Sequence, residues 1–592
     1  MKFLQNRIPS VTDENFQLRW LKALFRFTAV TLGGLHTWAA ATRYSMNPDG
    51  IAYIHMGEAY MRRDWSSALN SYWSPLYSWV LGLALHLPNP PMRWEFPLIH
   101  IVNFSVYLVT LLCFEFFWCQ LRGPQQGQVT LVSGGKSLTL PGWAWLGLGY
   151  TFFIWSSLNL IKIWAVTPDM FVAAFVYLAA GIIVHIRTAA ASWRTSALLG
   201  IVLGFGYLAK AAMFPMAFVF LGVSLLSVGN LRRAISLALT ASVFFLLIGG
   251  PYIAVLSNAK GRFTFSDAGK LMYAWHVNGI PYPHWQGEVP GGGIPKHPSR
   301  KIFDVPPIYE FGTPIGGTYP VSYDPSYWYE GVVPHFDLRG QIRVLLSGAQ
   351  IYFDLFFRQL GGLIVGLLIL YVFGQRRQVR VADILRQWGL VIPAFAALGM
   401  YALVHVQSRY IGAFVVLLWA DLLANVRLPD LPTSNKLMNL VSVTMILIML
   451  INIAAFNFEG FNALISNAFR TQSVSQQALP PSWPGEVAEE LHRLGIQPGG
   501  RVAIIGYGFD AFWARLARVQ IVAEMLEWQA EAFWLGDSTV RSQVIEAFAH
   551  TGAKAIVAEH VPAYASLAGW HRIGDTDYYI YLVTEEAPAQ LP

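Results

Sequence analysis

The chain has 592 residues, of which 55% are hydrophobic and only 13% are charged. Soluble domains carry about 25% charged residues, so this composition excludes a soluble enzyme. It also excludes a disordered chain, because disorder requires low hydrophobicity and high charge. The 41 Lys and Arg exceed the 34 Asp and Glu by seven. In a membrane protein this small excess indicates orientation in the bilayer, and no basic run interleaved with aromatics supports nucleic-acid binding.

Runs of about 17 to 25 mainly apolar residues predict membrane-spanning helices. The sequence has about eleven such runs, near residues 24–42, 96–121, 142–160, 168–186, 196–209, 212–228, 234–256, 359–374, 389–406, 411–424 and 437–456. No small-residue cleavage site follows the first run, which therefore predicts an uncleaved span. The expected fold class is a polytopic α-helical membrane protein.

Segment 74–88 is apolar but shorter than a typical span. If it does not cross the membrane and the N-terminus is cytoplasmic, every short basic connector is also cytoplasmic, as the positive-inside rule requires. These connectors are residues 122–141, 187–195, 229–233, 375–388 and 425–436. We therefore expect segment 74–88 to lie along the interface, with residues 43–95, the loop 257–358 and the tail from 457 on the outer face.

The two large outer pieces differ in composition. Loop 257–358 is rich in Gly, Pro, Tyr and Trp, and its aromatics favour an ordered, functional loop. From about residue 480 the pattern alternates between helix and buried strand, which predicts a small α/β domain. We therefore divide the chain into a transmembrane domain, 1–460, and an extracytoplasmic α/β domain, 461–592. The tail sequence GYGFDAF resembles only a fragment of a dinucleotide-binding motif and predicts a turn between a strand and a helix.

Two acids at the outer ends of spans are candidates for chemistry, because ionisable groups at membrane depth are costly. Asp49 lies in NPDG just after the first run, where it is either a turn or cap residue or a carboxylate at the mouth of a cavity. Asp169 follows Pro168 at the start of the fourth run, where helix capping alone also explains it. The predicted topology puts both acids on the same side of the membrane, which favours a shared site.

Two cations lie on the same side. Lys210 lies between two apolar runs, where its amine either snorkels to the interface or binds an anion. Arg409 begins a span and has a planar fork suited to phosphate oxygens, although an interfacial anchor beside Tyr410 is the alternative. The two acids and two cations together predict a site for a charged substrate at the outer face.

Further candidates for substrate binding come from the outer segments. They are polar or aromatic residues that offer hydrogen bonds or rings for stacking: Tyr53, Glu58, His284, Trp285, His297, Arg300, Tyr319 and Trp328. The sequence contains no HExxH pair, CxxC pair or other dense set of metal ligands, so we expect no structural metal.

At these residues the sequence resembles the GT-C glycosyltransferases, in particular the branch with the protein O-mannosyltransferases and the lipid A aminoarabinose transferases. The resemblance rests on Asp49 after the first span, on YWSPLYSW at 72–79, on the acid in TPDM, and on SRY at Ser408 to Tyr410. It covers about residues 20–460 and leaves the tail outside. In these enzymes the Pro-Leu helix is juxtamembrane, which agrees with the orientation argument.

The resemblance implies an inverting enzyme of the bacterial inner membrane that moves a monosaccharide from a polyprenyl phosphate to a glycan, lipid or protein acceptor. Asp49 would be the general base and Asp169 a second acid, while Lys210 and Arg409 would bind the lipid phosphate. No cofactor is required, and a divalent cation stays open. One departure matters: this chain has Trp73-Ser74-Pro75-Leu76 where those two groups carry Glu-Lys or His before the Pro-Pro-Leu. Neither acceptor can therefore be inferred.

Two other functions stay open at the level of sequence. A transporter or flippase of lipid-linked sugars would often show internal repeats, and the two halves of this chain show none. A non-catalytic envelope-assembly subunit would use the tail to recruit partners.

Overall fold

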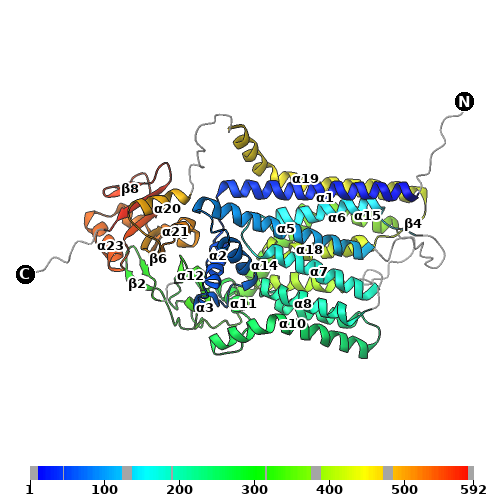
Figure 1. Ribbon diagram of the computed structural model, residues 1–592, viewed down its shortest axis with the longest axis horizontal. Coiled ribbons are helices and arrows are strands. Elements are labelled where there is room, and N and C mark those ends of the chain that lie inside the picture. The colour runs from blue at the N-terminus through cyan, green and yellow to red at the C-terminus, as the bar shows by residue number, and fades with distance from the viewer. Residues whose placement is uncertain are drawn as a thin grey trace, which may run out of the picture.

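The computed structural model describes residues 11–44, 46–122, 137–188, 191–313, 316–374, 388–470 and 484–583. Most of the basic connectors 122–141 and 375–388, on which the orientation prediction depends, lies outside these ranges. Figure 1 shows a bundle of long, roughly aligned helices with a smaller α/β unit at one end, and this unit holds the C-terminal part of the chain.

Eleven helices coincide with the predicted apolar runs: α1 (Val11–Arg43), α5 (Met92–Arg122), α6 (Gly142–Trp155), α7 (Asp169–Thr188), α8 (Trp193–Ala209), α9 (Met213–Leu226), α10 (Leu231–Lys260), α15 (Gly361–Gly374), α17 (Trp388–Ala402), α18 (Ser408–Ala424) and α19 (Pro432–Arg470). Among the described residues, α5, α7, α10 and α19 are long and apolar enough to cross a membrane. A fifth span results if α14 (Leu338–Phe353) and α15, bent by 66° at a break, are one span. Eleven crossings and the orientation of the N-terminus stay predictions.

Three short helices lie between α1 and α5: α2 (Pro48–Met61), α3 (Trp65–Ala68) and α4 (Pro75–His86). Both α2 and α4 begin with proline, whose fixed φ suits the first helical position. Helix α4 has 12 residues, fewer than the roughly 20 that a span requires. A Cβ at Gly57 of α2 would lie 2.6 Å from the carbonyl oxygen of Ser78 in α4, so the two backbones touch at this point. This contact fixes α2, which carries Asp49.

Helix α8 ends directly before Lys210. It begins with a capping box, in which the Ser192 hydroxyl accepts a hydrogen bond from the Thr195 backbone N–H. It then packs closely on α10, because a Cβ at Gly200 would lie 2.1 Å from the carbonyl oxygen of Ala241. The helix stops at Ala209, and Lys210 is the first residue beyond it.

The α/β unit contains a sheet of seven strands in the order β2-β3-β6-β5-β7-β9-β8. Its elements in the tail are α20 (Pro484–Arg493), β5 (Arg501–Gly506), α21 (Phe512–Ala517), β6 (Gln520–Leu526), α22 (Glu531–Leu535), α23 (Ser538–His550), β7 (Ala555–Glu559), β8 (Trp570–Arg572) and β9 (Tyr578–Leu582). Strand β5 is parallel to β6 and β7, and the other pairs are antiparallel.

The outer loop supplies part of this sheet. Its elements are α11 (Ala268–His276), β2 (Arg300–Phe303), β3 (Ile308–Glu310), α12 (Pro320–Tyr323) and α13 (Pro325–Trp328). Strand β3 pairs with β6 of the tail, with Tyr309 opposite Glu524. The loop and the tail are therefore one folded unit. The predicted domain boundary at residue 461 lies inside α19, which continues to Arg470. At the opposite end of the bundle, β1 (Ser137–Leu138) and β4 (Leu428–Pro429) form a short two-stranded sheet.

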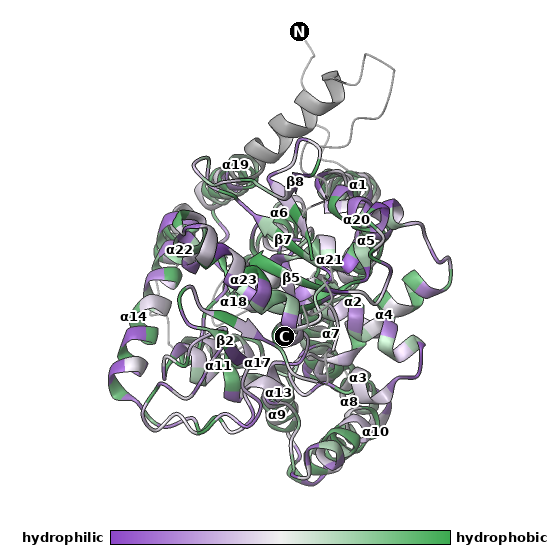
Figure 2. Cartoon of the chain, turned by 90° about the vertical axis from the view of Figure 1, so that its left-hand side faces the viewer, coloured by the Kyte–Doolittle hydropathy of each residue, from purple (hydrophilic) through white to green (hydrophobic). Residues whose placement is uncertain are grey.

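Apolar side chains cover both faces of the central strands. Residues Val502 and Ile504 of β5 pack with α20 and α21, whereas Ala503 and Ile505 pack with α22 and α23. Figure 2 looks onto this end of the molecule and shows the apolar strands of the sheet in front of the helical bundle. The core on the α20 and α21 side also includes Ile51 of α2 and Phe96 of α5. The sheet is thus packed directly against α2 and α5.

A buried arginine joins the two parts. Arg515 of α21 is 2% exposed, its Nε lies 3.1 Å from Glu95 Oε1 of α5, and its Nη1 lies 2.9 Å from Glu58 Oε2 of α2. Burial opposes the ionisation of Glu58, but the charge and hydrogen bonds of Arg515 outweigh it and lower the Glu58 pKa to about 2. Glu58 is therefore ionised at neutral pH.

We expect Arg515→Ala to lower the free energy of unfolding by about 3–5 kcal/mol, because it leaves the buried Glu95 without its counter-charge and leaves Glu58 to the exposed Arg62 at 3.7 Å. Denaturant titration of the purified protein in detergent measures this loss. Arg541→Ala is the matched control, since the Arg541 side chain donates a weak hydrogen bond of 3.4 Å to the carbonyl oxygen of Asp537, and its effect should stay within about 0.5 kcal/mol. Equal losses for the two variants would contradict this role of Arg515.

Candidate active site

A cavity of about 470 Å³ lies where the bundle meets the α/β unit. We call it the chamber. Its charged side chains come from four helix ends: Asp49 from the first turn of α2, Asp169 from the start of α7, Lys210 from just beyond α8, and Arg409 from the start of α18. Residues far apart in the sequence meet here because these four helix ends lie at the same end of the bundle.

The starts of α2 and α7 are tied together by one side chain. Asn47, which precedes α2, accepts a hydrogen bond from the backbone N–H of Val166 at 2.6 Å and donates one to its carbonyl oxygen at 3.2 Å. A Cβ on Gly50 would lie 2.7 Å from the Val166 Cβ, so no larger residue fits between the two segments. Asp49 and Asp169 are brought to the same wall by these contacts.

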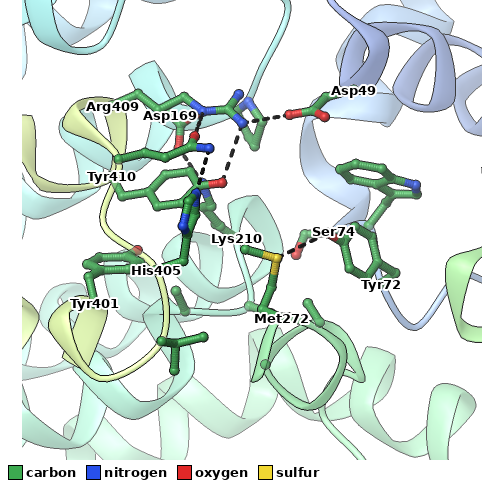
Figure 3. A pocket seen from close by; sticks show the side chains of 18 of the residues that line it. Asp49, Tyr72, Ser74, Asp169, Lys210, Met272, Tyr401, His405, Arg409 and Tyr410 are labelled. Carbon is green, nitrogen blue, oxygen red and sulfur yellow. Dashed lines mark hydrogen bonds and ion pairs between the residues drawn. The ribbon is translucent and has the colours of Figure 1, made fainter. Parts of the chain in front are cut away.

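The four charged groups alternate in sign, as Figure 3 shows. Lys210 Nζ lies 2.5 Å from Asp169 Oδ1, and Arg409 Nη2 lies 2.8 Å from Asp49 Oδ2. Arg409 Nε is also 3.7 Å from Asp169 Oδ2, so its guanidinium bridges the two acids. The group carries no net charge, and each cation is held by a carboxylate.

The two acids differ in their access to the chamber. The Asp169 side chain is only 2% exposed, whereas that of Asp49 is 22% exposed. Lys210 and Arg409 are each 21% exposed. Asp169 is thus a buried support for both cations, while Asp49 and the cations can reach a ligand. The Asp169 carboxylate contacts these two side chains and so does more than interact with the dipole of α7.

Aromatic and amide groups hold the cations in place. Lys210 Nζ lies 3.6 Å from the centre of the Tyr410 ring, and the Arg409 guanidinium carbon lies 5.1 Å from it. Arg409 Nε also donates to Gln407 Oε1 at 2.7 Å. A phosphate could therefore approach guanidinium and ammonium groups that are already oriented.

Two histidines form the wall beside Gln407. The His276 and His405 rings stack with their centres 3.9 Å apart. Gln407 Nε2 lies 3.0 Å from His405 Nε2 and donates to it, because the Gln407 oxygen already accepts from Arg409. Burial, with smaller effects of His276 and Arg409, lowers the His405 pKa to about 4. His405 is thus neutral at pH 7.

The rest of the chamber is mostly apolar. Its lining includes Ala211, Ala212 and Pro215 after α8, Phe265 and Met272 near α11, and Met400 and Val404 near the end of α17. A cavity of this kind, with converging charges at one side and apolar walls at the other, fits an amphiphilic ligand with an anionic head.

The tail also contributes to the chamber through Phe509. This residue lies in the turn after β5, where a strand-to-helix turn was expected. Glu524 of β6 holds the turn, because its Oε1 accepts a hydrogen bond from the Gly508 backbone N–H at 2.6 Å. The Glu524 Oε2 atom accepts from the Tyr319 hydroxyl at 2.9 Å and lies 2.6 Å from His284 Nε2. The tail is thus part of the chamber wall.

Of the predicted substrate contacts, Tyr53 lines the chamber. The other seven do not line it, because they are paired with other residues or buried in the core. Glu58 pairs with Arg515, His284 and Tyr319 with Glu524, His297 with Glu330, and Arg300 with Glu310, while Trp285 and Trp328 are buried in the core of the α/β unit. None of these seven side chains therefore lines the chamber, and their roles in substrate binding stay predictions.

Sequence reasoning missed several lining residues, among them Tyr72, His276, His405 and Gln407. A usable signal existed for two of them. His405 and Gln407 alternate in the short segment before α18 and lead to Arg409 in its first turn, and alternate residues of an extended segment point to the same side. His276 and Tyr72 gave no such signal.

In the described part of the chain, no group of three or more His, Cys, Asp or Glu side chains is arranged to hold a metal ion. The groups that face Asp49 and Asp169 are Arg409 and Lys210. The expectation that no cofactor is required, with a divalent cation left open, stays a prediction.

No protein-family model and no curated protein matches the sequence. Solved structures do match. ArnT from Cupriavidus metallidurans gives a TM-score of 0.47 in the apo state, with 14% identity over 94% of this chain and 97% of that chain. The same protein bound to undecaprenyl phosphate gives 0.48, with 13% identity over 96% and 99%. AglB, an archaeal oligosaccharyltransferase from Archaeoglobus fulgidus in complex with an inhibitory peptide and a dolichol-phosphate, gives 0.43, with 12% identity over 91% and 70%.

These matches include the kind of protein that the sequence motifs resemble, because ArnT is a lipid A aminoarabinose transferase. All three TM-scores are below 0.5 and all three identities are at most 14%. They therefore carry no conclusion about the reaction, which has to come from the side chains of the chamber.

The different exposures of the two acids predict different effects on stability. Asp169→Asn should lower the free energy of unfolding by about 3 kcal/mol or more, because Lys210 loses its buried partner. Asp49→Asn should cost about 1 kcal/mol or less, since this pair is partly open to solvent. Denaturant titration of both variants in detergent gives the comparison, and a larger loss for Asp49→Asn would contradict the assignment of Asp169 as the support.

Proposed function

We propose that the protein is an inverting membrane glycosyltransferase, which moves a monosaccharide from a polyprenyl phosphate to an acceptor hydroxyl at the outer face. The observation that carries this proposal is the alternating group of two carboxylates and two cations at one side of a chamber with apolar walls. The proposed location is the bacterial inner membrane, with the N-terminus cytoplasmic and the α/β unit outside.

The donor fits the two sides of the chamber. Its phosphate would lie against Lys210 and Arg409, and the first part of its lipid would lie along the apolar wall near Pro215 and Met400. A guanidinium fork presents paired donors that suit phosphate oxygens, and the ammonium adds a point charge. Undecaprenyl phosphate and dolichol-phosphate, which are bound to ArnT and AglB in the matched structures, are ligands of this chemistry.

Asp49 is the proposed general base. The acceptor oxygen attacks the anomeric carbon, its proton passes to the Asp49 carboxylate, and the bond between the anomeric carbon and the phosphate oxygen breaks. The bonding electrons leave with the polyprenyl phosphate, so a single displacement inverts the anomeric centre. Asp49 is suited to this role because it is the more exposed acid and its partner Arg409 is also the proposed phosphate ligand. A phosphate that takes over Arg409 frees the Asp49 carboxylate to accept the proton.

Lys210 and Arg409 stabilise the leaving group. The charge on the phosphate grows as the sugar departs, so cations already oriented toward it stabilise the transition state more than the ground state. Asp169 is a positioning residue in this scheme, because it holds Lys210 at 2.5 Å and contacts Arg409. The acceptor is a glycan, lipid or protein of the cell envelope, and no nucleic acid is involved.

Asp49→Asn should lower kcat by roughly 10²- to 10⁴-fold, the usual contribution of general base catalysis, with little change in KM for the donor. Transfer is measured with purified protein and a set of polyprenyl-phosphate sugars. Asp304→Asn is the control, because Asp304 is an exposed carboxylate of the outer loop that does not line the chamber. Full transfer activity in Asp49→Asn would remove Asp49 from the role of base.

Arg409→Lys should raise the donor KM and lower kcat, together by roughly 10²-fold or more, although it keeps the positive charge. The reason is that lysine cannot bridge Asp49 and Asp169 and still present a fork to phosphate. Lys210→Gln should act in the same direction. Arg339→Lys, at an exposed arginine of α14, serves as the control substitution. An Arg409→Lys enzyme with wild-type kcat and KM would contradict the proposed phosphate site.

A further inference from the structure

A second cavity, of about 400 Å³, lies between three segments of the chain. We call it the junction cavity. It is lined by the C-terminal end of α2, by the outer loop near Thr318, and by the tail on either side of Arg518. None of the residues that line it lines the chamber. It is a separate space, for which the proposed transfer reaction supplies no role.

The junction cavity has two guanidinium groups whose donors its carboxylates, Glu58 and Asp64, do not use up. Asp64 accepts hydrogen bonds from the Ser66 hydroxyl and the Ser67 backbone N–H. Glu58 is taken by the buried Arg515, whose guanidinium it shares with Glu95. Arg62 lies only 3.7 Å from this same Glu58 oxygen, and its side chain is 64% exposed. Arg518 is exposed and makes no side-chain hydrogen bond or ion pair within the described residues. Arg62 and Arg518 therefore present free donors to the cavity.

The remaining wall offers neutral hydrogen-bonding groups. His55 Nε2 lies 2.7 Å from the Thr318 hydroxyl oxygen, and burial, reinforced by the nearby Arg515 charge, lowers the His55 pKa to about 3. His55 is thus neutral and adds no charge. Gln520 and the backbone of Gly317 also line the cavity, and the ring of Tyr323 forms part of its wall. In contrast to the chamber, this lining is mainly polar, which suits a ligand rich in hydroxyl groups.

We propose that the junction cavity binds an anionic saccharide. Arg62 and Arg518 hold its carboxylate or phosphate group, since guanidinium forks match both kinds of oxyanion. The hydroxyl groups of the sugar pair with the neutral groups of the wall. This site is independent of the transfer reaction, because binding to it requires neither a donor nor Asp49.

The experiment is calorimetric titration of the purified full-length protein in detergent with four probes: trigalacturonate, glucose 6-phosphate, the neutral maltotriose, and inorganic phosphate. We expect one or both acidic saccharides to bind, and the first two probes distinguish a carboxylate from a phosphate as the recognised group. Arg518→Ala and Arg62→Ala should each weaken this binding roughly tenfold or more. Both arginines are exposed, so neither substitution leaves a buried charge behind.

Arg63→Ala is the matched control, because Arg63 is the exposed neighbour of Arg62 and does not line the cavity. It should leave the affinity within about twofold, a change that the loss of one exposed charge outside the cavity can produce. Maltotriose binding as tight as that of the acidic saccharides would overturn the role of the arginines. If inorganic phosphate bound as tightly as glucose 6-phosphate, the cavity would not recognise a saccharide. If neither acidic saccharide bound, or if Arg63→Ala and Arg518→Ala had equal effects, the proposed binding site would be wrong.

Discussion

The bridge that Arg409 makes between Asp49 and Asp169 is the interaction on which the candidate site depends. It joins the starts of three helices, α2, α7 and α18, and with Lys210 it adds the end of α8. Charges at the end of an apolar bundle are costly unless they are paired, and here each is paired. The same pairing leaves Arg409 and Asp49 partly exposed to the chamber, so the groups that stabilise one another are also the ones that a ligand can reach.

In the proposed reaction, binding of the phosphate and release of the base are one event. Arg409 holds Asp49 through an ion pair of 2.8 Å. A phosphate that competes for the guanidinium would weaken that hold. Asp169, the buried partner of Lys210, would keep the cations in place while Asp49 turns to the acceptor. The α/β unit also contributes to the chamber, because Phe509 forms part of its wall and Arg515 joins the unit to α2 and α5.

The four charged residues of the chamber could be predicted from the sequence for a physical reason. Asp49, Asp169, Lys210 and Arg409 each stand at the end of an apolar run, where a charge is conspicuous, and the structure brings all four together. The partners of the outer-loop residues could not be predicted in this way. His284 contacts Glu524, which lies 240 residues further along the chain, and β3 pairs with a strand of the tail. The local sequence around His284 and β3 therefore gives no sign of these partners. Charged residues in that loop therefore looked like candidate ligands although they hold the fold together.

A density map of the protein with a polyprenyl phosphate bound would show whether Arg409 changes partner when the donor binds. We expect the phosphate within hydrogen-bonding distance of Lys210 Nζ and the Arg409 guanidinium, the lipid along the wall near Pro215 and Met400, and Asp49 no longer in contact with Arg409. A phosphate bound away from Lys210 and Arg409, or bound with the contact between Asp49 and Arg409 unchanged, would contradict the proposed phosphate site.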